Sequence, residues 1–435
     1  MRRARTMVAG LLVMAMSAPA ARMLSAYPQV PFEEAVRDLS SPAAATRLKT
    51  ARLLHEAAYP EAAVPLAQLI ADPDDTIQLE AIAAEMNVFR ADKIVPRKRV
   101  GFVVEVRKSL EAEAAFGAGP LALGPSPVPM AVLTALLTAA RDDNPRVRLE
   151  AVYAFGTLAV EAGGARRLEL LRVSGPDLAA MVGAMDPAHR YAALRVLGRV
   201  FARRLGDPPI DQPVGDAVIS ALNEPDAPMR AAAMDALGAM RYDRALKGIG
   251  DTFQYHGKGG MAETALDALA HIAHPSSVPQ FVAQLPSKTT ALRRIAIEGL
   301  ARAGDQSQLS AVRASLRGER NDSLLLAGDF AAAMLLPDAG ESLAPIVTAL
   351  SVPRLREQAR GYLNTLVVGR AMAAGRYLGD ASPAVRTDIV DALGDSGDVA
   401  ALPVVERLSS EHEPSVARAV ERARARLGQL RPAGA

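Results

Sequence analysis

The stretch that decides the fold is SPAVRTDIVDALG, residues 382–394. Ser382 is a natural N-cap, and Pro383 follows it at the first helical position, where a missing N–H has no effect on the helix. The apolar residues recur every four positions on one helix face: Val385, Ile389 and Leu393. The stretch therefore predicts a short amphipathic helix, and we expect Gly394 to end it in the left-handed conformation.

A second helix is expected directly after this one. Asp398 can cap it, and its apolar residues then recur at intervals of three: Val399, Leu402, Val405 and Leu408. Two short helices joined by tight turns fill about 31 residues. Residues 382–408 therefore predict a helical hairpin.

The same pattern recurs along the chain. Each clear copy carries an Arg seven residues before a large apolar residue, and we call these residues the Arg ladder: Arg47, Arg148, Arg190, Arg230, Arg293, Arg356 and Arg386. In weaker copies the Arg is replaced (Gln78, Ala262 and Leu324) or the apolar residue is small (Arg418). Six successive spacings from Arg230 onward lie between 30 and 32 residues. Because one hairpin cannot bury its own apolar stripe, the pattern predicts an all-α solenoid of about 11 repeats with a period of about 31 residues.

Longer spacings and composition divide the chain further. We expect a signal peptide at 1–20, repeats at 31–87, an insertion at 88–130, the main repeat array at 131–427 and a tail at 428–435. The insertion contains a basic stretch, a helix expected over 101–115 and a loop rich in Gly and Pro. Further loop extensions are expected near 161–176 and 204–214, and insertions of this kind tend to lie on the binding face of a solenoid.

The repeat resembles HEAT repeats, specifically the compact type of the phycobilisome-lyase HEAT-like group. The matching features are an Asp four residues before the Arg (Asp226 with Arg230, Asp186 with Arg190) and an Ala-Leu-Gly exit at 236–238 and 392–394. The resemblance implies a stacked helical architecture. It implies little about activity.

The amino terminus, MRRARTMVAGLLVMAMSAPA, predicts export. Its three Arg, ten-residue apolar run and Ala-Pro-Ala site match a secretory signal. The alternative is an uncleaved anchor, although an uncharged run of 16 residues is short for the ~20 residues that a membrane span needs. We therefore expect a periplasmic or secreted protein, with membrane contact only if residues 1–20 are retained.

Composition excludes several classes of function. The chain has no Cys, which removes disulfide frameworks, cysteine metal sites and thiol nucleophiles. Loss of 1–20 removes three Arg and no acidic residue, so the formal net charge falls from +2 to −1. A nearly neutral chain lacks the basic footprint of a nucleic-acid-binding protein.

Two groups of residues are candidate contact sites for a protein partner. The first is the basic segment with Arg97, Lys98 and Arg99. The second is the region 242–260, where an aromatic-poor protein gathers Tyr242, Phe253, Tyr255, His256 and Lys258. The Arg ladder could bind an acidic partner, but we favour a structural role in which each Arg pairs with a loop Asp or with backbone carbonyls of the neighbouring repeat.

No reaction centre is expected. His55-Glu56 and His412-Glu413 resemble the His-Glu pairs of deoxyhypusine hydroxylase, a HEAT-repeat enzyme that uses four such motifs, but this chain has two. His256, His271 and His274 could in principle hold a metal, although a helix end is the simpler explanation. We therefore predict no catalytic, metal or cofactor site.

These observations favour an exported, non-enzymatic scaffold that binds a protein partner on the solenoid surface. Two alternatives remain open. One is an enzyme accessory or cofactor-handling protein similar to the bilin lyases. The other is a structural envelope protein anchored by its N-terminus.

Overall fold

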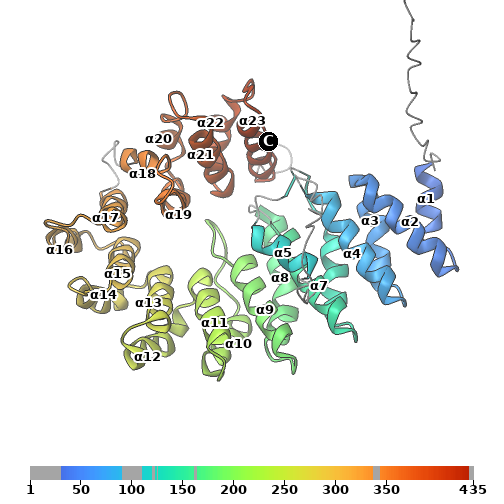
Figure 1. Cartoon of the computed structure of the whole chain (residues 1–435), viewed down its shortest axis with the longest axis horizontal. Coiled ribbons are helices and arrows are strands. Elements are labelled where there is room, and N and C mark those ends of the chain that lie inside the picture. Colours follow the sequence, from blue (N-terminus) through green and yellow to red (C-terminus); the bar gives the residue numbers. More distant parts are fainter. Residues whose placement is uncertain are drawn as a thin grey trace, which may run out of the picture.

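The computed structural model describes residues 31–90, 110–119, 123–124, 126–160, 164–336 and 343–430. Over these residues the chain consists of helices, 3₁₀ turns and connecting loops, and its helices stack as hairpins along a curve (Figure 1). The prediction of an all-α solenoid is therefore confirmed. The expected signal peptide at 1–20 and the basic residues Arg97, Lys98 and Arg99 lie outside the described residues.

The second helix of each hairpin lies on the inner side of the curve and packs against the second helix of the next hairpin. These helices are α2 (Ala44–Ala57), α4 (Asp75–Phe89), α7 (Pro145–Leu158), α9 (Pro187–Val200), α11 (Ala227–Met240), α13 (Gly260–Ile272), α15 (Thr290–Ala303), α17 (Asp322–Leu335), α19 (Arg356–Leu366), α21 (Pro383–Asp395) and α23 (Pro414–Gly428).

The first helix of most hairpins is shorter, and Figure 1 shows α12, α14, α16 and α18 on the outer side. These first helices are α1 (Phe32–Asp38), α3 (Ala63–Ala67), α6 (Met130–Ala139), α8 (Gly164–Val182), α10 (Gln212–Ser220), α12 (Leu246–His256), α14 (Val278–Gln284), α16 (Leu309–Ser315), α18 (Ala344–Ala349), α20 (Ala371–Gly375) and α22 (Leu402–Glu406). A 3₁₀ turn precedes several of them. The turn Val399–Ala401 before α22 leaves Val399 48% exposed, so this residue does not join the expected stripe.

The register of the repeat follows the sequence pattern. The apolar residue seven positions after each member of the Arg ladder is at most 2% exposed: Leu54, Phe155, Leu197, Leu237, Leu300, Leu363 and Leu393. These side chains fill the layer between consecutive hairpins, so they supply the burial that one hairpin alone lacks.

The expectation for Gly394 was wrong. Helix α21 continues through Asp395, and Gly394 is not among the residues with positive φ. A Cβ at this position would lie 2.8 Å from the Cα of Ala423 in α23, closer than side chains tolerate. Gly238 and Gly198 are in the same situation, each with a Cα of the next inner helix 3.1 Å away. The Leu-Gly pair therefore marks close contact between inner helices, and this contact narrows the inner side of the stack.

The stack curls until distant repeats meet. A Cβ on Gly164, at the start of α8, would lie 3.7 Å from the carbonyl oxygen of Gln429, which follows α23. The loop 203–207, after α9, lines one cavity with residues 364–368 and 395–396. The two ends of the main array thus enclose an interior that the inner helices face.

Within the described part of the insertion, one helix packs against the inner helix α7. Helix α5 (Glu111–Ala118) begins ten residues later than the helix expected over 101–115, of which 101–109 lie outside the described residues. The Glu150 carboxylate of α7 accepts hydrogen bonds from the backbone N–H groups of Glu111 (3.1 Å) and Ala112 (2.9 Å). A carboxylate at a helix N-terminus satisfies unpaired donors, so this contact fixes α5 on α7.

No helix among the described residues is long and apolar enough to cross a membrane.

Glu85 in α4 gives a pH-dependent prediction. Its side chain is 0% exposed, neither carboxyl oxygen has a hydrogen-bond partner among the described residues, and burial raises its pKa to about 9. In the unfolded chain the group ionises near its ordinary value of 4.5. Between these two values the unfolded state loses a proton that the folded state keeps, so stability falls as pH rises.

We expect Glu85→Gln to remove this loss. Relative to the wild type, the variant should gain about 2 kcal/mol of unfolding free energy between pH 5 and pH 7. Urea unfolding at the two pH values measures the difference. Glu61→Gln, which changes an exposed carboxyl in the same part of the chain, is the control. Parallel pH profiles for Glu85→Gln and the wild type would contradict the prediction.

Candidate functional site on the concave face

Polar residues recur at two positions of the inner helices. We call the ladder Arg of each repeat, or the residue that replaces it, the repeat marker. The residue five positions after the marker lines a cavity on the inner side in four successive hairpins: Arg195, Asp235, Asp267 and Glu298. The residue nine positions after the marker also lines a cavity in several hairpins: Arg199, His271, Arg302, Thr365 and Asp395. The two positions are one helical turn apart, so they form adjacent rows on one face.

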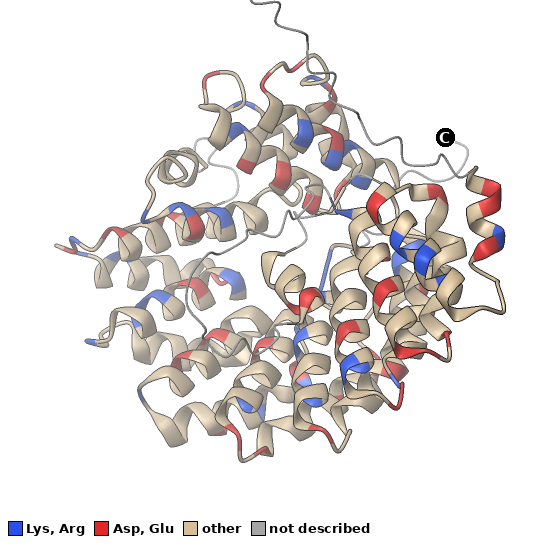
Figure 2. Cartoon of the chain, turned by 45° about the vertical axis from the view of Figure 1, so that its right-hand side comes forward, with Lys and Arg blue, Asp and Glu red and all other residues tan. Residues whose placement is uncertain are grey.

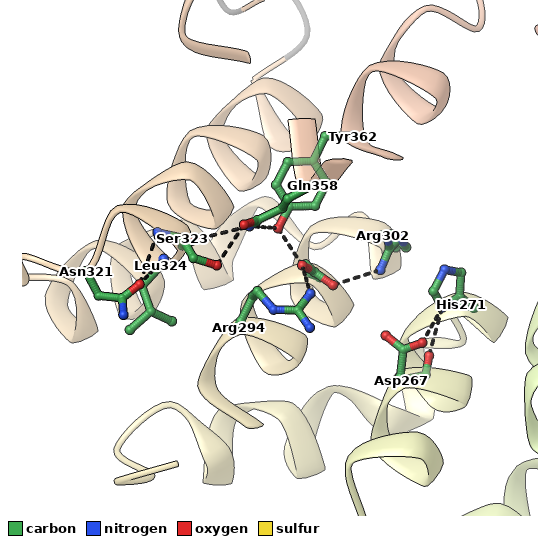
Figure 3. Close-up of polar contacts among 10 residues, drawn as sticks. Asp267, His271, Arg294, Arg302, Asn321, Ser323, Leu324, Gln358 and Tyr362 are labelled. Carbon is green, nitrogen blue, oxygen red and sulfur yellow. Dashed lines mark hydrogen bonds and ion pairs between the residues drawn. The ribbon is translucent and has the colours of Figure 1, made fainter. Parts of the chain in front are cut away.

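The largest group of these residues surrounds Glu298 of α15 (Figure 3). Its carboxylate, 2% exposed, accepts a hydrogen bond from Arg294 at 2.7 Å and lies 3.6 Å from the guanidinium of Arg302. It also accepts a hydrogen bond from the hydroxyl of Tyr362 in α19. A buried carboxylate needs such partners, because burial without them is strongly unfavourable.

Helices α17 and α19 hold Tyr362 in place. Its ring stacks on Phe330 with centroids 4.3 Å apart, and its hydroxyl accepts a hydrogen bond of 2.7 Å from the Gln358 amide. Gln358 in turn exchanges hydrogen bonds with Ser323, whose hydroxyl donates to it at 2.7 Å and whose carbonyl accepts at 2.9 Å. Burial and the charge of Glu298 raise the pKa of Tyr362, so the phenol stays protonated.

Asp267 and His271 of α13 line the same inner cavity as Glu298. The His271 ring nitrogen Nδ1 lies 3.0 Å from the backbone oxygen and 3.3 Å from the carboxylate of Asp267. Burial opposes ionisation of Asp267, but the His271 contact and the charges of Arg302 and Arg294 lower its pKa. Burial and the nearby Asp267 carboxylate raise the pKa of Asp235. The pKa values of the neighbouring Asp235 and Asp267 are therefore shifted in opposite directions.

The cavity that these residues line has a volume of about 580 Å³. Its wall combines five carboxylate residues with two Arg: Asp235, Glu263, Asp267, Glu298, Glu357, Arg294 and Arg302. Most of its polar contacts are internal, within and between α13, α15, α17 and α19. The described residues hold no group of His, Asp and Glu arranged for a metal ion. The arrangement suits recognition of a polar surface by charge and hydrogen bonding.

A second cavity, of about 440 Å³, lies between α5, α9 and α11. The Arg199 guanidinium lies 3.5 Å from the centre of the Phe116 ring, and that of Arg195 lies 5.1 Å from it. Burial, with the charge of Arg195, lowers the pKa of Arg199 to about 10. Asp235 lines both cavities, so they form one continuous concave face. Figure 2 shows acidic and basic residues interspersed along the solenoid.

The Arg ladder lies in the first turn of the inner helices. Its members pair with carboxylates of the following hairpin: Arg47 with Asp72, Arg148 with Asp186, Arg190 with Glu224, Arg293 with Glu319, Arg356 with Asp388 and Arg386 with Glu411. Several also donate to carbonyls of the turn before their own helix. Arg230 donates to the carbonyl oxygens of Glu224 at 2.7 Å and Pro225 at 2.9 Å. These contacts join one turn to the next, as a structural role requires.

We expect Arg230→Ala to lower the free energy of unfolding by about 1 to 2 kcal/mol, because two turn carbonyls lose a charged donor. Partner affinity should change little. Arg244→Ala, which removes an exposed ion pair to Asp216, is the matched control and should leave stability nearly unchanged. A variant at Arg230 that keeps wild-type stability but loses partner binding would reverse the assignment.

The predicted contact region 242–260 is divided by the structure. Tyr242 and Phe253 are each 6% exposed, so they belong to the core and cannot line a contact surface, which corrects the expectation for these two residues. Tyr255 is 87% exposed and its ring packs edge-on against His256, with centroids 5.0 Å apart. Lys258 is exposed. A contact through Tyr255, His256 and Lys258 stays a prediction.

Three of the histidines have local partners. His55 lies 2.7 Å from Glu80 of the neighbouring helix, and His274 accepts the backbone N–H of Ser276 at 3.2 Å. His271 contacts Asp267, as described above.

The concave residues were missed at the sequence level, although a signal for them exists. Asp235, Asp267 and Glu298 interrupt apolar helices at one fixed offset from the repeat marker. A charged residue that recurs at one repeat position among Ala and Leu indicates a shared face. Which residues meet across that face depends on the curl of the stack.

Comparison with known proteins relates one hairpin of this chain to a known repeat family. The HEAT repeat model matches residues 132–160, which include most of α6, the turn after it and all of α7. No curated protein matches the chain. Among solved structures, an engineered protein aligns with 91% of this chain and 98% of its own, at 17% identity and a TM-score of 0.43. The complex of CpcE and CpcF of phycocyanin lyase from Nostoc sp. PCC7120 aligns with 58% of this chain and 94% of its own, at 18% identity and a TM-score of 0.39.

The resemblance to HEAT repeats is thereby confirmed. The matched segment is one hairpin of the stack, formed by α6 and α7, and further helical hairpins lie before and after it. Residues 132–160 are therefore similar to a HEAT repeat, in a chain whose described residues stack as helical hairpins.

Proposed function

We propose that this chain is an exported, non-enzymatic scaffold that binds a protein partner on its concave face. The observation that carries the proposal is the gathering of both charge signs along one face, with Asp235, Asp267 and Glu298 beside Arg294 and Arg302. A partner with complementary charges would gain specificity from this pattern. Export is supported by the signal pattern of residues 1–20.

One feature of the cavity supports binding over catalysis. The cavity is open along the inner helices, whereas most reaction centres exclude water. A purified mature protein that carries a metal or a chromophore would instead favour the cofactor-handling alternative.

Site-specific photocross-linking tests the binding face. A cross-linker replaces Glu357, whose side chain is 93% exposed at the cavity wall, or Arg313, an exposed residue of the outer helix α16. We expect a discrete adduct in the envelope fraction from position 357 and none from position 313. Equal labelling from both positions, or none from 357, would overturn the concave assignment.

Amino-terminal sequencing of the same material tests export. We expect the mature chain to begin at Ala21, directly after the Ala-Pro-Ala site. Retention of residues 1–20 in the membrane fraction would replace export by anchoring, and retention in the cytosolic fraction would overturn both.

A further inference from the structure

The interior of the curl contains a cavity of about 610 Å³ whose wall is rich in Arg. We call it the arginine cavity. It lies between the loop 203–207 on one side and α19, α21 and the loop before α20 on the other. Four Arg line it together with two carboxylates and three neutral polar residues: Arg203, Arg204, Arg241, Arg370, Asp207, Asp395, Asn364, Thr365 and Ser396. A cavity of this size fits a small organic molecule.

Both carboxylates at the wall already have partners. Asp207 accepts two hydrogen bonds of 2.8 Å from Arg167, whose side chain is 1% exposed, and a third from the backbone N–H of Arg204 at 2.9 Å. Asp395 pairs with Arg426 of α23. The two acids therefore have counter-ions in Arg167 and Arg426, and among the described residues neither makes a hydrogen bond or ion pair with Arg203, Arg241 or Arg370.

Two of these guanidinium groups face the cavity without a partner. Among the described residues, the side chains of Arg203 and Arg241 make no hydrogen bond or ion pair, and Arg370 makes one hydrogen bond, to the carbonyl of Ala333 at 2.6 Å. The cavity walls lower the pKa of Arg241, and the charges of Arg302 and Arg203 lower it further. Like charges held this close repel one another, so the cluster is stable only because the fold imposes it.

The fold fixes the backbone that carries Arg203 and Arg241. The backbone N–H of Arg203 donates to the carbonyl of Ala239 at 2.8 Å, which ties the loop to α11. Arg167 donates to the carbonyl of Ala202 at 2.9 Å, below the same loop. Arg241 follows α11 in the left-handed conformation, with φ 52°. Donors that are placed before a ligand arrives bind it with little loss of entropy.

We propose that the arginine cavity binds a small oxyanion with two or more negative charges, held by Arg203, Arg241 and Arg370. Guanidinium groups pair with phosphate and carboxylate oxygens through two parallel hydrogen bonds, and both chemistries satisfy this wall. Asn364, Thr365 and Ser396 would supply neutral contacts to the rest of the ligand. The site goes beyond the proposed partner binding and does not depend on it.

Titration calorimetry on the purified mature protein tests the site, with pyrophosphate as the phosphate probe and citrate as the carboxylate probe. We expect saturable binding of one or both at a single site. Arg241→Gln and Arg370→Gln should each weaken it by about tenfold or more. Arg313→Gln on the outer helix α16 should leave it unchanged. Preference for one probe identifies the oxyanion class, and either preference supports the proposal.

The unliganded variants give a second readout. Without an anion, Arg241→Gln should be at least as stable as the wild type, because it relieves repulsion and breaks no described contact. If Arg370→Gln fails to fold, Arg203→Gln on the exposed loop replaces it. The proposal is overturned if neither probe binds saturably, or if the Arg241 and Arg203 variants bind as the wild type does. Since no partner protein is present, these results are independent of the cross-linking experiment.

Discussion

Leu300→Asp should lower the free energy of unfolding by about 4 kcal/mol, because it places an unpaired carboxylate between two hairpins. Leu300 in α15 is 0% exposed and occupies the repeat position seven residues after Arg293. Its surroundings are the apolar layers of α13 and α17, which pack on α15 from either side. In a stack held by nearest-neighbour contacts, the damage should concentrate in the repeats next to α15.

Urea unfolding followed by circular dichroism measures the effect. Leu325→Asp in the next inner helix is the matched control, since Leu325 is 39% exposed and its replacement should cause a much smaller loss. Hydrogen exchange would locate the weakened region at α13 to α17. Wild-type stability for Leu300→Asp would mean that the assigned register is wrong.

Asp207→Asn should lower the unfolding free energy by about 3 kcal/mol, because it leaves the buried charge of Arg167 without its counter-ion. Arg167 is 1% exposed, and its guanidinium bonds to Asp207 through two nitrogens, at 2.8 Å each. The same carboxylate holds the backbone of Arg204. The substitution should therefore also loosen the loop 203–207, which faces the C-terminal repeats.

A double variant separates the two effects. Arg167→Met combined with Asp207→Leu removes both charges and should recover much of the lost stability, since an apolar pair of similar volume can replace a buried ion pair. Thermal unfolding compares the single and double variants with the wild type. A double variant as unstable as Asp207→Asn would indicate that loop contacts, and not the unpaired charge, cause the loss.

Much of the fold could be predicted because the repeat signal is local. Ser382 and Pro383 start a helix through capping and fixed φ, and the spacing of Val385, Ile389 and Leu393 places one face in the core. The role of Gly394 could not be found in this way. A glycine at a helix end and a glycine under a crossing backbone have the same sequence context, and Ala423 lies 29 residues further along the chain.

The candidate site depends on contacts that local patterns do not contain. The sequence predicts a surface position for Tyr242, but its ring covers Gly215, where a Cβ would lie 2.3 Å away, and its hydroxyl donates to Asp216 at 2.8 Å. Similarly, the spacing of repeats does not give the curvature of the stack. Without the curvature, Arg203 and Arg370 are distant residues, whereas in the structure they line one cavity.

The distance between residues 205 and 364, across the interior, tests the curl of the stack most directly. The chain has no Cys, so spin labels can be placed at Leu205→Cys and Asn364→Cys alone. Both residues are exposed and line the arginine cavity from opposite sides. A curled stack predicts a single short distance between the labels in pulsed electron resonance. An extended solenoid separates them by the repeats between α9 and α19, and a long or broad distance distribution would contradict the enclosed concave face.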